Sequence, residues 1–212
     1  MKKTIYDFNY EQLKEWLLGH NEKPFRTNQV FGWLYRKRIN EFKEMTDIKQ
    51  SLIDTFDQEF VVNPIKLKQR QASKDGTVKY LFELQDGFLV ETVLMQFDYG
   101  KSVCVSSQVG CNMGCTFCAS GLLKKNRDLT SGEMLAQVMY VQKELDVLEQ
   151  RVSHIVIMGT GEPFDNYDNV MNFLYTVNHD LGLAIGARHL SVSTCGVVPR
   201  IRQFAREKVQ YN

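Results

Sequence analysis

Residues 104–118 read Cys-Val-Ser-Ser-Gln-Val-Gly-Cys-Asn-Met-Gly-Cys-Thr-Phe-Cys, which places four of the chain's five cysteines in one short stretch. Cys111, Cys115 and Cys118 follow the spacing C-x3-C-x2-C. Three thiolates on one loop can hold three irons of a [4Fe–4S] cubane and leave the fourth iron without a protein ligand. The amino and carboxylate groups of S-adenosylmethionine can chelate such an open iron, and an electron from the cluster can then cleave the sulfonium to a 5′-deoxyadenosyl radical. The motif therefore indicates an iron–sulfur site.

Two other interpretations of these cysteines stay open from the residues alone. They can be free structural cysteines, or they can bind zinc with Cys104 as the fourth ligand, although zinc loops favour C-x2-C pairs. A disulfide framework is disfavoured because the cysteines crowd together and the first residues contain no apolar segment typical of an export signal. No apolar run approaches the ~20 residues of a membrane span. We therefore expect a cytoplasmic protein with no membrane partner.

The composition is that of an ordinary globular protein of 212 residues, with 43% apolar and 24% charged residues. The formal net charge is only +1, so composition alone does not indicate a nucleic-acid binder. Any RNA contact must come from local basic patches.

The hydrophobic pattern divides the chain into three regions. Apolar residues recur at helical spacing in residues 1–62, which predicts a small helical domain. Residues 63–96 contain two strand-like runs separated by Gln85-Asp-Gly, a pattern that predicts a β-hairpin. Residues 97–212 then alternate between strand and helix, which favours an α/β fold with a parallel sheet.

Three strand–helix units are expected in this last region. The strands are predicted at 102–106, 154–158 and 190–193, and the helices after the capping box Thr130…Glu133, over 170–177 and from Pro199. A fourth strand would begin at residues 209–212.

The turn after the second predicted strand reads Gly159-Thr-Gly161-Glu162-Pro163. Small residues let the backbone approach a ligand, and Glu162 can accept from an ammonium group. The third strand ends in Ser191-Val-Ser193-Thr194, whose hydroxyls suit a ribose. Because ligand sites lie at the carboxyl ends of parallel strands, we expect both turns beside the cysteine loop.

The cysteine stretch, the Gly-Thr-Gly-Glu-Pro turn and Ser-Thr-Cys-Gly-Val-Val-Pro199 together resemble the radical-SAM adenosine C2-methyltransferases of ribosomal and transfer RNA. The likeness covers essentially the whole chain. It implies a partial radical-SAM (β/α) barrel: residues 1–62 would be a helical accessory RNA-binding domain, residues 63–96 a hairpin linker carrying Glu91, and residues 97–212 the amino-terminal half of the core domain. It also implies 23S rRNA and tRNA as substrates and an external flavodoxin-like electron donor.

The resemblance assigns roles residue by residue. Cys111, Cys115 and Cys118 match the cluster ligands, Gly161 and Glu162 match contacts to the methionine part of S-adenosylmethionine, Ser193 matches a further cofactor contact, Glu91 matches the proton acceptor, and Cys104 matches a second redox cysteine. In the family mechanism one cofactor methylates a cysteine near the carboxyl terminus. A second cofactor yields the radical that activates this methyl group for addition to C2 of adenine. Glu91 then takes the C2 proton, and Cys104 forms a transient disulfide that releases the product.

The chain departs from this family in length. Members continue well past Asn212, and the methyl-carrying cysteine lies in that further part, so we expect the chain to be inactive alone. Cys195 lies in the third-strand motif and is expected to be a small buried residue. The alternative functions are another radical-SAM reaction on protein, and a zinc-stabilised RNA-binding module.

Glu91 and two basic patches have simpler interpretations as well. Without the resemblance, Glu91 would be a strand carboxylate paired with a lysine. Basic residues that alternate along one strand or follow the cysteine motif can contact RNA phosphates, whereas lysines also protect edge strands. These residues are Lys66, Lys68 and Arg70 in the first patch, and Lys124, Lys125 and Arg127 in the second.

Overall fold

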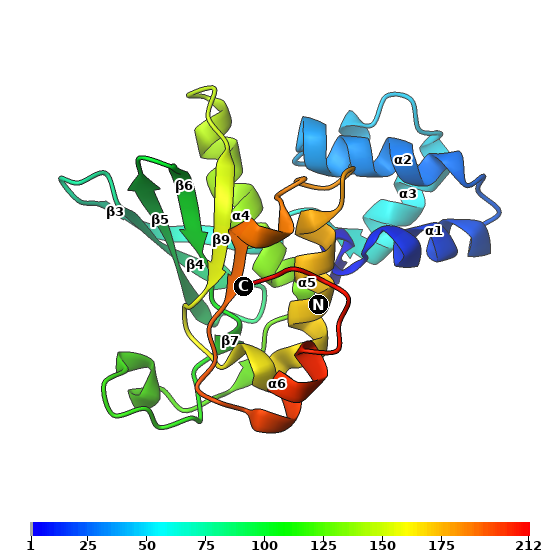
Figure 1. The fold of residues 1–212 in the computed structure, drawn as a ribbon. Helices are drawn as coiled ribbons and strands as arrows, with labels where there is room; N and C mark the ends of the chain where they lie inside the picture. Colours follow the sequence, from blue (N-terminus) through cyan, green and yellow to red (C-terminus); the bar gives the residue numbers. More distant parts are fainter. Residues whose placement is uncertain (1) are drawn as a thin grey trace.

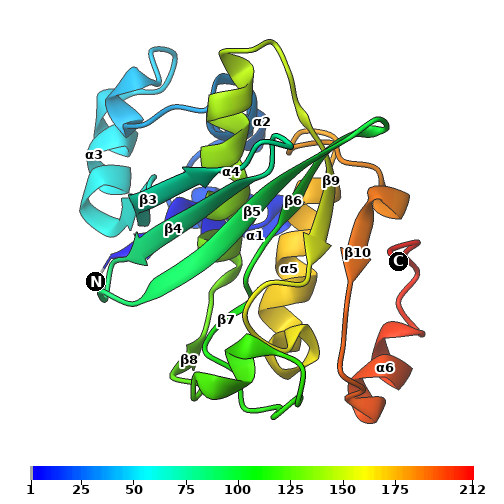
Figure 2. The same ribbon diagram turned by 90° about the vertical axis from the view of Figure 1, so that its left-hand side faces the viewer.

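A six-stranded mixed sheet forms the centre of the computed structural model, which describes residues 2–212 (Figures 1 and 2). The strand order is β10-β9-β6-β5-β4-β3. In chain order the strands are β3 (Ile65–Ala72), β4 (Val78–Leu84), β5 (Leu89–Phe97), β6 (Gly100–Cys104), β9 (Val152–Ile157) and β10 (Leu190–Val192). Strands β3 to β6 pair antiparallel, whereas β6, β9 and β10 run parallel.

Each parallel strand is followed by a helix, as the sequence predicts. These helices are α4 (Ser131–Asp146), α5 (Tyr167–Asn178) and α6 (Val198–Phe204). Figure 2 shows α4 and α5 behind the sheet and α6 beyond β10. Helix α4 begins at the predicted capping box, because the Thr130 hydroxyl accepts from the Glu133 N–H while the Glu133 carboxylate accepts from the Thr130 N–H. The α/β fold class is confirmed.

The last residue of the chain pairs with the edge strand β10. Asn212 donates its N–H to the Leu190 carbonyl at 2.9 Å and accepts from the Val192 N–H at 2.8 Å. Two bonds that flank one residue in this way are the pattern of a parallel pair. The predicted start of a fourth strand therefore lies in parallel against β10.

The predicted hairpin is present as β4 and β5, and it belongs to the same sheet as the parallel strands. β5 pairs with β6 through Val93↔Cys104, so the hairpin continues the sheet without a break. β3 is the edge strand, and every residue of it after Ile65 is exposed. The alternation of Lys66, Lys68 and Arg70 on β3 therefore does not reflect a buried face and an exposed face of the strand.

The amino-terminal region contributes its buried side chains to the same hydrophobic core as the sheet. Its elements are β1 (Lys3–Thr4), a 3-10 turn (Ile5–Asp7), α1 (Tyr10–Gly19), α2 (Phe25–Phe31), a π-helical turn (Gly32–Lys37), a 3-10 turn (Phe42–Glu44), α3 (Gln50–Glu59) and β2 (Phe60–Val61). Leu13, Leu17 and Phe56 are fully buried in this region. Asp7 joins it to the start of α4, because its carbonyl accepts from the Ser131 hydroxyl and its carboxylate from the Gly132 N–H.

The remaining elements are short, and all but Ala187–His189, which contacts the start of β9, lie near the candidate site. They are β7 (Gln108–Val109), a 3-10 turn (Ala119–Leu122), β8 (Arg127–Asp128), a 3-10 turn (Pro163–Asn166) and a 3-10 turn (Ala187–His189). Among residues 2–212 there is no helix with the length and apolar character needed to span a membrane.

Candidate active site

The cysteine motif lies on a loop that is closed at its base by the short pair β7–β8. Gln108 pairs with Asp128 and Val109 with Arg127, so residues 110–126 project from the carboxyl end of β6. Gly110 has φ +76° at this base, and a side chain there would collide with the Lys124 carbonyl. A glycine is therefore required where the loop leaves β7.

All five cysteines are free, and three of them share this loop. Cys111 and Cys115 are half-buried, whereas Cys118 is exposed. The Cys111 N–H donates to the Leu123 carbonyl at 2.8 Å, and the Cys118 N–H donates to the Cys115 carbonyl at 3.1 Å. Gly114, between the first two cysteines, adopts φ +65° with open space around it. In the part of the chain that the structure describes, no three His, Cys, Asp or Glu side chains are already gathered around one metal position.

The donor set nevertheless fits an iron–sulfur cluster. The three thiols are unpaired and lie on one loop with a fixed base, and there is open space beside Gly114, between the first two cysteines. Thiolates are the usual protein ligands of such clusters, and three of them leave one iron open for a second ligand.

The Gly-Thr-Gly-Glu turn packs closely against the segment that precedes the cysteine loop. A Cβ on Gly159 would lie 2.7 Å from the Ser106 Oγ, and one on Gly161 would lie 2.7 Å from the Ser107 Oγ. The Glu162 N–H donates to the Gln108 Oε1 at 2.9 Å. The small residues of this turn therefore bring the ends of β6 and β9 together.

Glu162 is 3% exposed and joins two strand ends. Its Oε1 accepts from the Phe164 N–H at 2.9 Å and from the Thr194 hydroxyl at 2.7 Å, and its Oε2 accepts from the Cys195 N–H at 2.7 Å. A carboxylate offers about four acceptor positions. One position on Oε2 thus remains for a further donor such as an ammonium group.

The turn after β10 lies beside the cysteine loop. Ser193 is exposed, and its N–H donates to the Ile157 carbonyl at 3.3 Å. Cys195 is exposed, so the expectation of a buried residue is wrong: β10 ends at Val192, and Cys195 lies in the open connection to α6. Partial desolvation of its thiol and the Glu162 carboxylate raise the pKa of Cys195 to about 11, with smaller contributions from Cys115 and Cys111.

Glu91 lines a cavity of about 720 Å³ between the hairpin and the cysteine loop. The hairpin side contributes Leu81, Gly87, Phe88, Leu89 and Glu91, and the other side contributes Val109, Gly110, Ala119, Ser120, Leu123, Lys124, Asn126 and Thr160. The Lys79 Nζ lies 3.2 Å from the Glu91 Oε1, and both side chains are about half exposed, at 48% and 50%. The expected lysine pair is therefore present, and Glu91 also lines the cavity shared with the cysteine loop.

Cys104 is the last residue of β6 and is half-buried between its neighbours in the sheet, Val93 on β5 and Val156 on β9. Burial raises the pKa of the Cys104 thiol, although a hydrogen bond from the Met158 backbone opposes this. Cys104 pairs with Val93, which lies two residues after Glu91 on β5.

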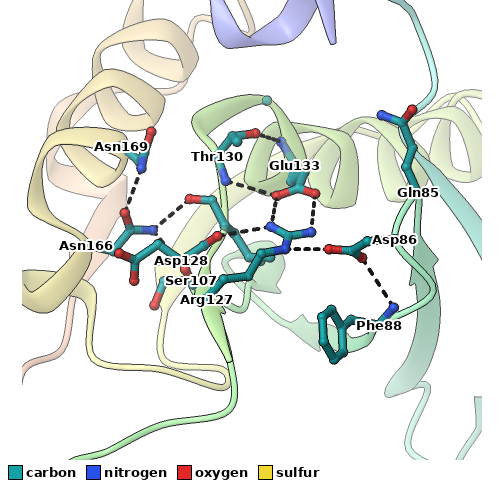
Figure 3. A network of polar contacts seen from close by, with 12 residues as sticks. Gln85, Asp86, Phe88, Ser107, Arg127, Asp128, Thr130, Glu133, Asn166 and Asn169 are labelled. Carbon is teal, nitrogen blue, oxygen red and sulfur yellow. Dashed lines mark hydrogen bonds and ion pairs between the residues drawn. The ribbon is translucent and has the colours of Figure 1, made fainter. Parts of the chain in front are cut away.

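Arg127 is held in an internal network and does not point to a free surface (Figure 3). Its guanidinium donates two 2.8 Å bonds to the Glu133 carboxylate and one 2.5 Å bond to the Asp86 carboxylate. The hydrogen bonds that Arg127 donates to Glu133 and to Asp86 raise its pKa. Burial would raise the pKa of Asp86, but Arg127 holds it below its usual value. RNA contact was one of two interpretations of Arg127, and these bonds favour the structural one: the residue ties the hairpin turn to the base of the cysteine loop and to α4.

Most of the other basic candidates are also paired. The Lys125 Nζ lies 2.7 Å from Asp165 and 2.8 Å from Asp128. On β3, Lys68 pairs with Glu83 at 3.1 Å, and Arg70 with Glu144 at 3.3 Å. Lys66 and Lys124 are exposed, and Lys124 also lines the Glu91 cavity. Lys124 is the basic residue best placed to meet a substrate there.

Two family models match this chain. The "Ribosomal RNA large subunit methyltransferase N-terminal domain" matches residues 3–62, and the "Radical SAM superfamily" matches residues 105–211. The second match covers the cysteine loop, the Gly-Thr-Gly-Glu turn and the turn after β10.

Curated relatives match over the full chain. A "Probable dual-specificity RNA methyltransferase RlmN" of Streptococcus suis is 62% identical over 214 residues, and proteins of the same name from Oceanobacillus iheyensis and Enterococcus faecalis are 59% identical. All of this chain is covered, but only 58% to 60% of those relatives. The chain thus spans about three fifths of their length.

A solved structure has a similar fold. The crystal structure of a radical SAM methyltransferase from Sphaerobacter thermophilus superposes with a TM-score of 0.93 at 36% identity, over 99% of this chain and 62% of that one. The two proteins are therefore similar in sequence as well as in fold.

Proposed function

Because this chain belongs to the radical SAM superfamily, we propose that it forms the amino-terminal part of an enzyme that methylates C2 of an adenosine in 23S rRNA and tRNA. The match of residues 3–62 to a ribosomal RNA methyltransferase domain and the names of the relatives support RNA as the substrate. Residues 1–62 are then the accessory RNA-binding domain, residues 63–96 the hairpin that carries Glu91, and residues 97–212 part of the radical-SAM core.

The observation that carries this proposal is the cavity between Glu91 and the cysteine loop. A proton acceptor must reach the atom from which it takes a proton, to within about 3 Å in the reacting complex. The cavity of about 720 Å³ is bordered by Glu91 on one side and by Ala119, Ser120 and Lys124 on the other. An adenine bound there would lie between the proton acceptor and the cysteine loop.

The cofactor-binding roles follow from the chemistry of the surrounding side chains. Cys111, Cys115 and Cys118 would hold a [4Fe–4S] cluster, and the open acceptor position of Glu162 would take the amino group of S-adenosylmethionine beside Gly161. The exposed Ser193 would contact the rest of the cofactor. When bound, the cluster and S-adenosylmethionine supply a 5′-deoxyadenosyl radical.

Glu91 and Cys104 would complete the reaction on the substrate side. Glu91, which pairs with Lys79, would take the proton from C2 of the adenine adduct. Cys104 would lose its thiol proton and attack the sulfur of the cysteine that holds the adduct, so that a disulfide forms as the carbon–sulfur bond breaks. The electron pair of that bond would stay on the methylene carbon, which takes up a proton and becomes the C2 methyl group. Both residues lie near the same end of the hairpin and the β5–β6 pair.

The remaining parts of the proposal concern the rest of the enzyme. The relatives are longer than this chain, and a methyl-carrying cysteine in their further part would leave residues 1–212 inactive alone. A flavodoxin-like protein would supply the electron, and the enzyme would act in the cytoplasm. A radical reaction on protein or a zinc-stabilised RNA-binding module has less support, because the two matched domains combine radical chemistry with an RNA methyltransferase domain.

The test is the 2-methyladenosine content of 23S rRNA and tRNA from a strain in which the gene is deleted, measured by mass spectrometry of nucleosides. We expect the modification to disappear from both RNAs and to return when the gene is restored. A Glu91→Gln gene should fail to restore it. Glu83→Gln, which alters a lysine-paired strand carboxylate outside the cavity, should restore it. Unchanged 2-methyladenosine in the deletion strain would contradict the proposal.

A further inference from the structure

The Ser106 hydroxyl lies between the two halves of the candidate active site. It accepts a hydrogen bond from the Thr160 N–H at 3.0 Å and donates one to the Glu91 carbonyl at 2.7 Å. Ser106 is 0% exposed, and the absence of a side chain on Gly159 leaves room for this contact. One side chain therefore joins the strand that carries the proton acceptor to the turn that carries Gly161 and Glu162.

Gln137 of α4 fixes Ser106 from the opposite side. Its Oε1 accepts from the Ser106 N–H at 3.0 Å and from the Thr92 hydroxyl at 2.8 Å, and its Nε2 donates to the Ser106 carbonyl at 3.1 Å. Gln137 and Thr92 are also 0% exposed. A buried polar network whose members are all paired is rigid, because each unpaired group would carry a desolvation cost.

The side chain of Glu91 has no comparable anchor. Its ion pair with Lys79 is half exposed, and such pairs contribute little to a fixed geometry. The backbone of Glu91, in contrast, is tied to Thr160 through one buried hydroxyl. Backbone pairing holds Glu91 against β4 and ties the cofactor turn to residues 105–108. The Ser106 hydroxyl adds a direct side-chain link between the Glu91 backbone and that turn.

We propose that Ser106, supported by Gln137, is a positioning residue that sets the distance between Glu91 and the cofactor turn. The inference rests on the proposed function, in which Glu91 takes the C2 proton. A displacement of about 1 Å in a reacting pair can reduce a rate by about 100-fold. Loss of the Ser106 hydroxyl should slow proton removal while leaving cofactor cleavage intact.

The first experiment is amide hydrogen exchange on the 212-residue chain, followed in residues 89–93 and 158–162. Ser106→Ala should raise exchange in both segments by about tenfold, the order expected when a buried hydrogen bond is removed and its partners stay unpaired. Ser131→Ala is the matched control, because the Ser131 hydroxyl also donates to a carbonyl and accepts from an N–H, but between Asp7 and Asn172. If either segment keeps its wild-type exchange, or if Ser131→Ala raises both equally, the inference is wrong.

The second experiment measures the reaction in an enzyme in which this chain is followed by the carboxyl-terminal part of the Streptococcus suis relative. With RNA deuterated at adenosine C2, Ser106→Ala should increase the isotope effect on methylation and leave 5′-deoxyadenosine formation unchanged. Equal loss of both activities without a larger isotope effect would overturn the inference. If Ser106→Ala does not fold, Thr92→Val removes the bond to Gln137 with little change of shape. This variant should also increase the isotope effect relative to the wild-type enzyme. A wild-type isotope effect in Thr92→Val would overturn the inference.

Glu91→Gln separates the inference from the function on which it rests. If Glu91→Gln methylates RNA normally, the proposed role of Glu91 fails, whatever Ser106→Ala does. If Glu91→Gln is inactive and Ser106→Ala has the wild-type isotope effect, only the positioning role fails.

Discussion

The Glu162 carboxylate accepts the Cys195 N–H at 2.7 Å and thereby joins the turn after β9 to the turn after β10. The same carboxylate accepts from the Thr194 hydroxyl and the Phe164 N–H, and it is 3% exposed. Glu162 is therefore a structural link between two strand ends before any cofactor binds, in addition to its proposed contact with the cofactor.

Replacing this carboxylate should destabilise the fold. Glu162→Gln keeps the shape but turns one acceptor oxygen into a donor, which leaves an N–H or hydroxyl of the neighbouring turn unpaired. We expect the free energy of unfolding to fall by about 1–3 kcal/mol, measured by urea denaturation. Glu15→Gln, an exposed change on α1, should stay within about 0.5 kcal/mol. Equal stability of the two variants would contradict the linking role.

The Arg127 network should matter more than a surface ion pair. Arg127→Gln leaves the carboxylates of Glu133 and Asp86, which are 10% and 15% exposed, without their cation. Breaking one partner of a buried pair costs about 3–5 kcal/mol, and the partial exposure of Arg127 lowers our expectation to about 2 kcal/mol. Lys68→Gln, which breaks the more exposed pair with Glu83, should cost at most about 1 kcal/mol. The comparison fails if thermal or urea unfolding ranks the two variants the other way.

The thiols of Cys104 and Cys118 should differ in their rate of reaction with iodoacetamide in the metal-free chain. Cys104 is half-buried and its pKa is raised by burial, so its reactive thiolate should form only at a higher pH than in an ordinary thiol. Cys118 is exposed and should be modified first. In peptide-level mass spectrometry we expect the Cys104 rate to keep rising at pH values where the rate of Cys118 has levelled off. Modification of Cys104 at neutral pH as fast as that of Cys118 would show that the thiol is open to solvent.

Local sequence patterns predicted the fold and the turns of the candidate site, because these features depend on residues that are neighbours in the sequence. The capping box at Thr130, the Asp-Gly hairpin turn and the placement of the cysteine loop after a strand all follow from short stretches of sequence. The Arg127 network and the Ser106–Gln137 contacts were not predicted, because their partners are separated by up to tens of residues and meet only when the sheet and α4 pack. The available signal was Gln137 as a single polar residue within the apolar run Leu135-Ala-Gln-Val-Met139 of α4.

Cys195 shows how a local pattern can mislead. Its place in a strand-end motif suggested burial, but the exposure of a residue at the end of an edge strand depends on what packs beyond that strand. In residues 2–212 only Asn212 pairs along the outer edge of β10.

The central claim is that Cys111, Cys115 and Cys118 bind an oxygen-sensitive [4Fe–4S] cluster with one open iron. It is tested most directly by iron and sulfide analysis after anaerobic reconstitution of the chain and of single cysteine variants. We predict about four irons per wild-type chain, a brown colour bleached by dithionite, and a change in the electron paramagnetic resonance spectrum when S-adenosylmethionine is added. Replacing any of the three cysteines by alanine should abolish bound iron, whereas Cys104→Ala and Cys195→Ala should retain it. Wild-type iron content in all three ligand variants, or loss of iron in Cys104→Ala, would contradict the assignment.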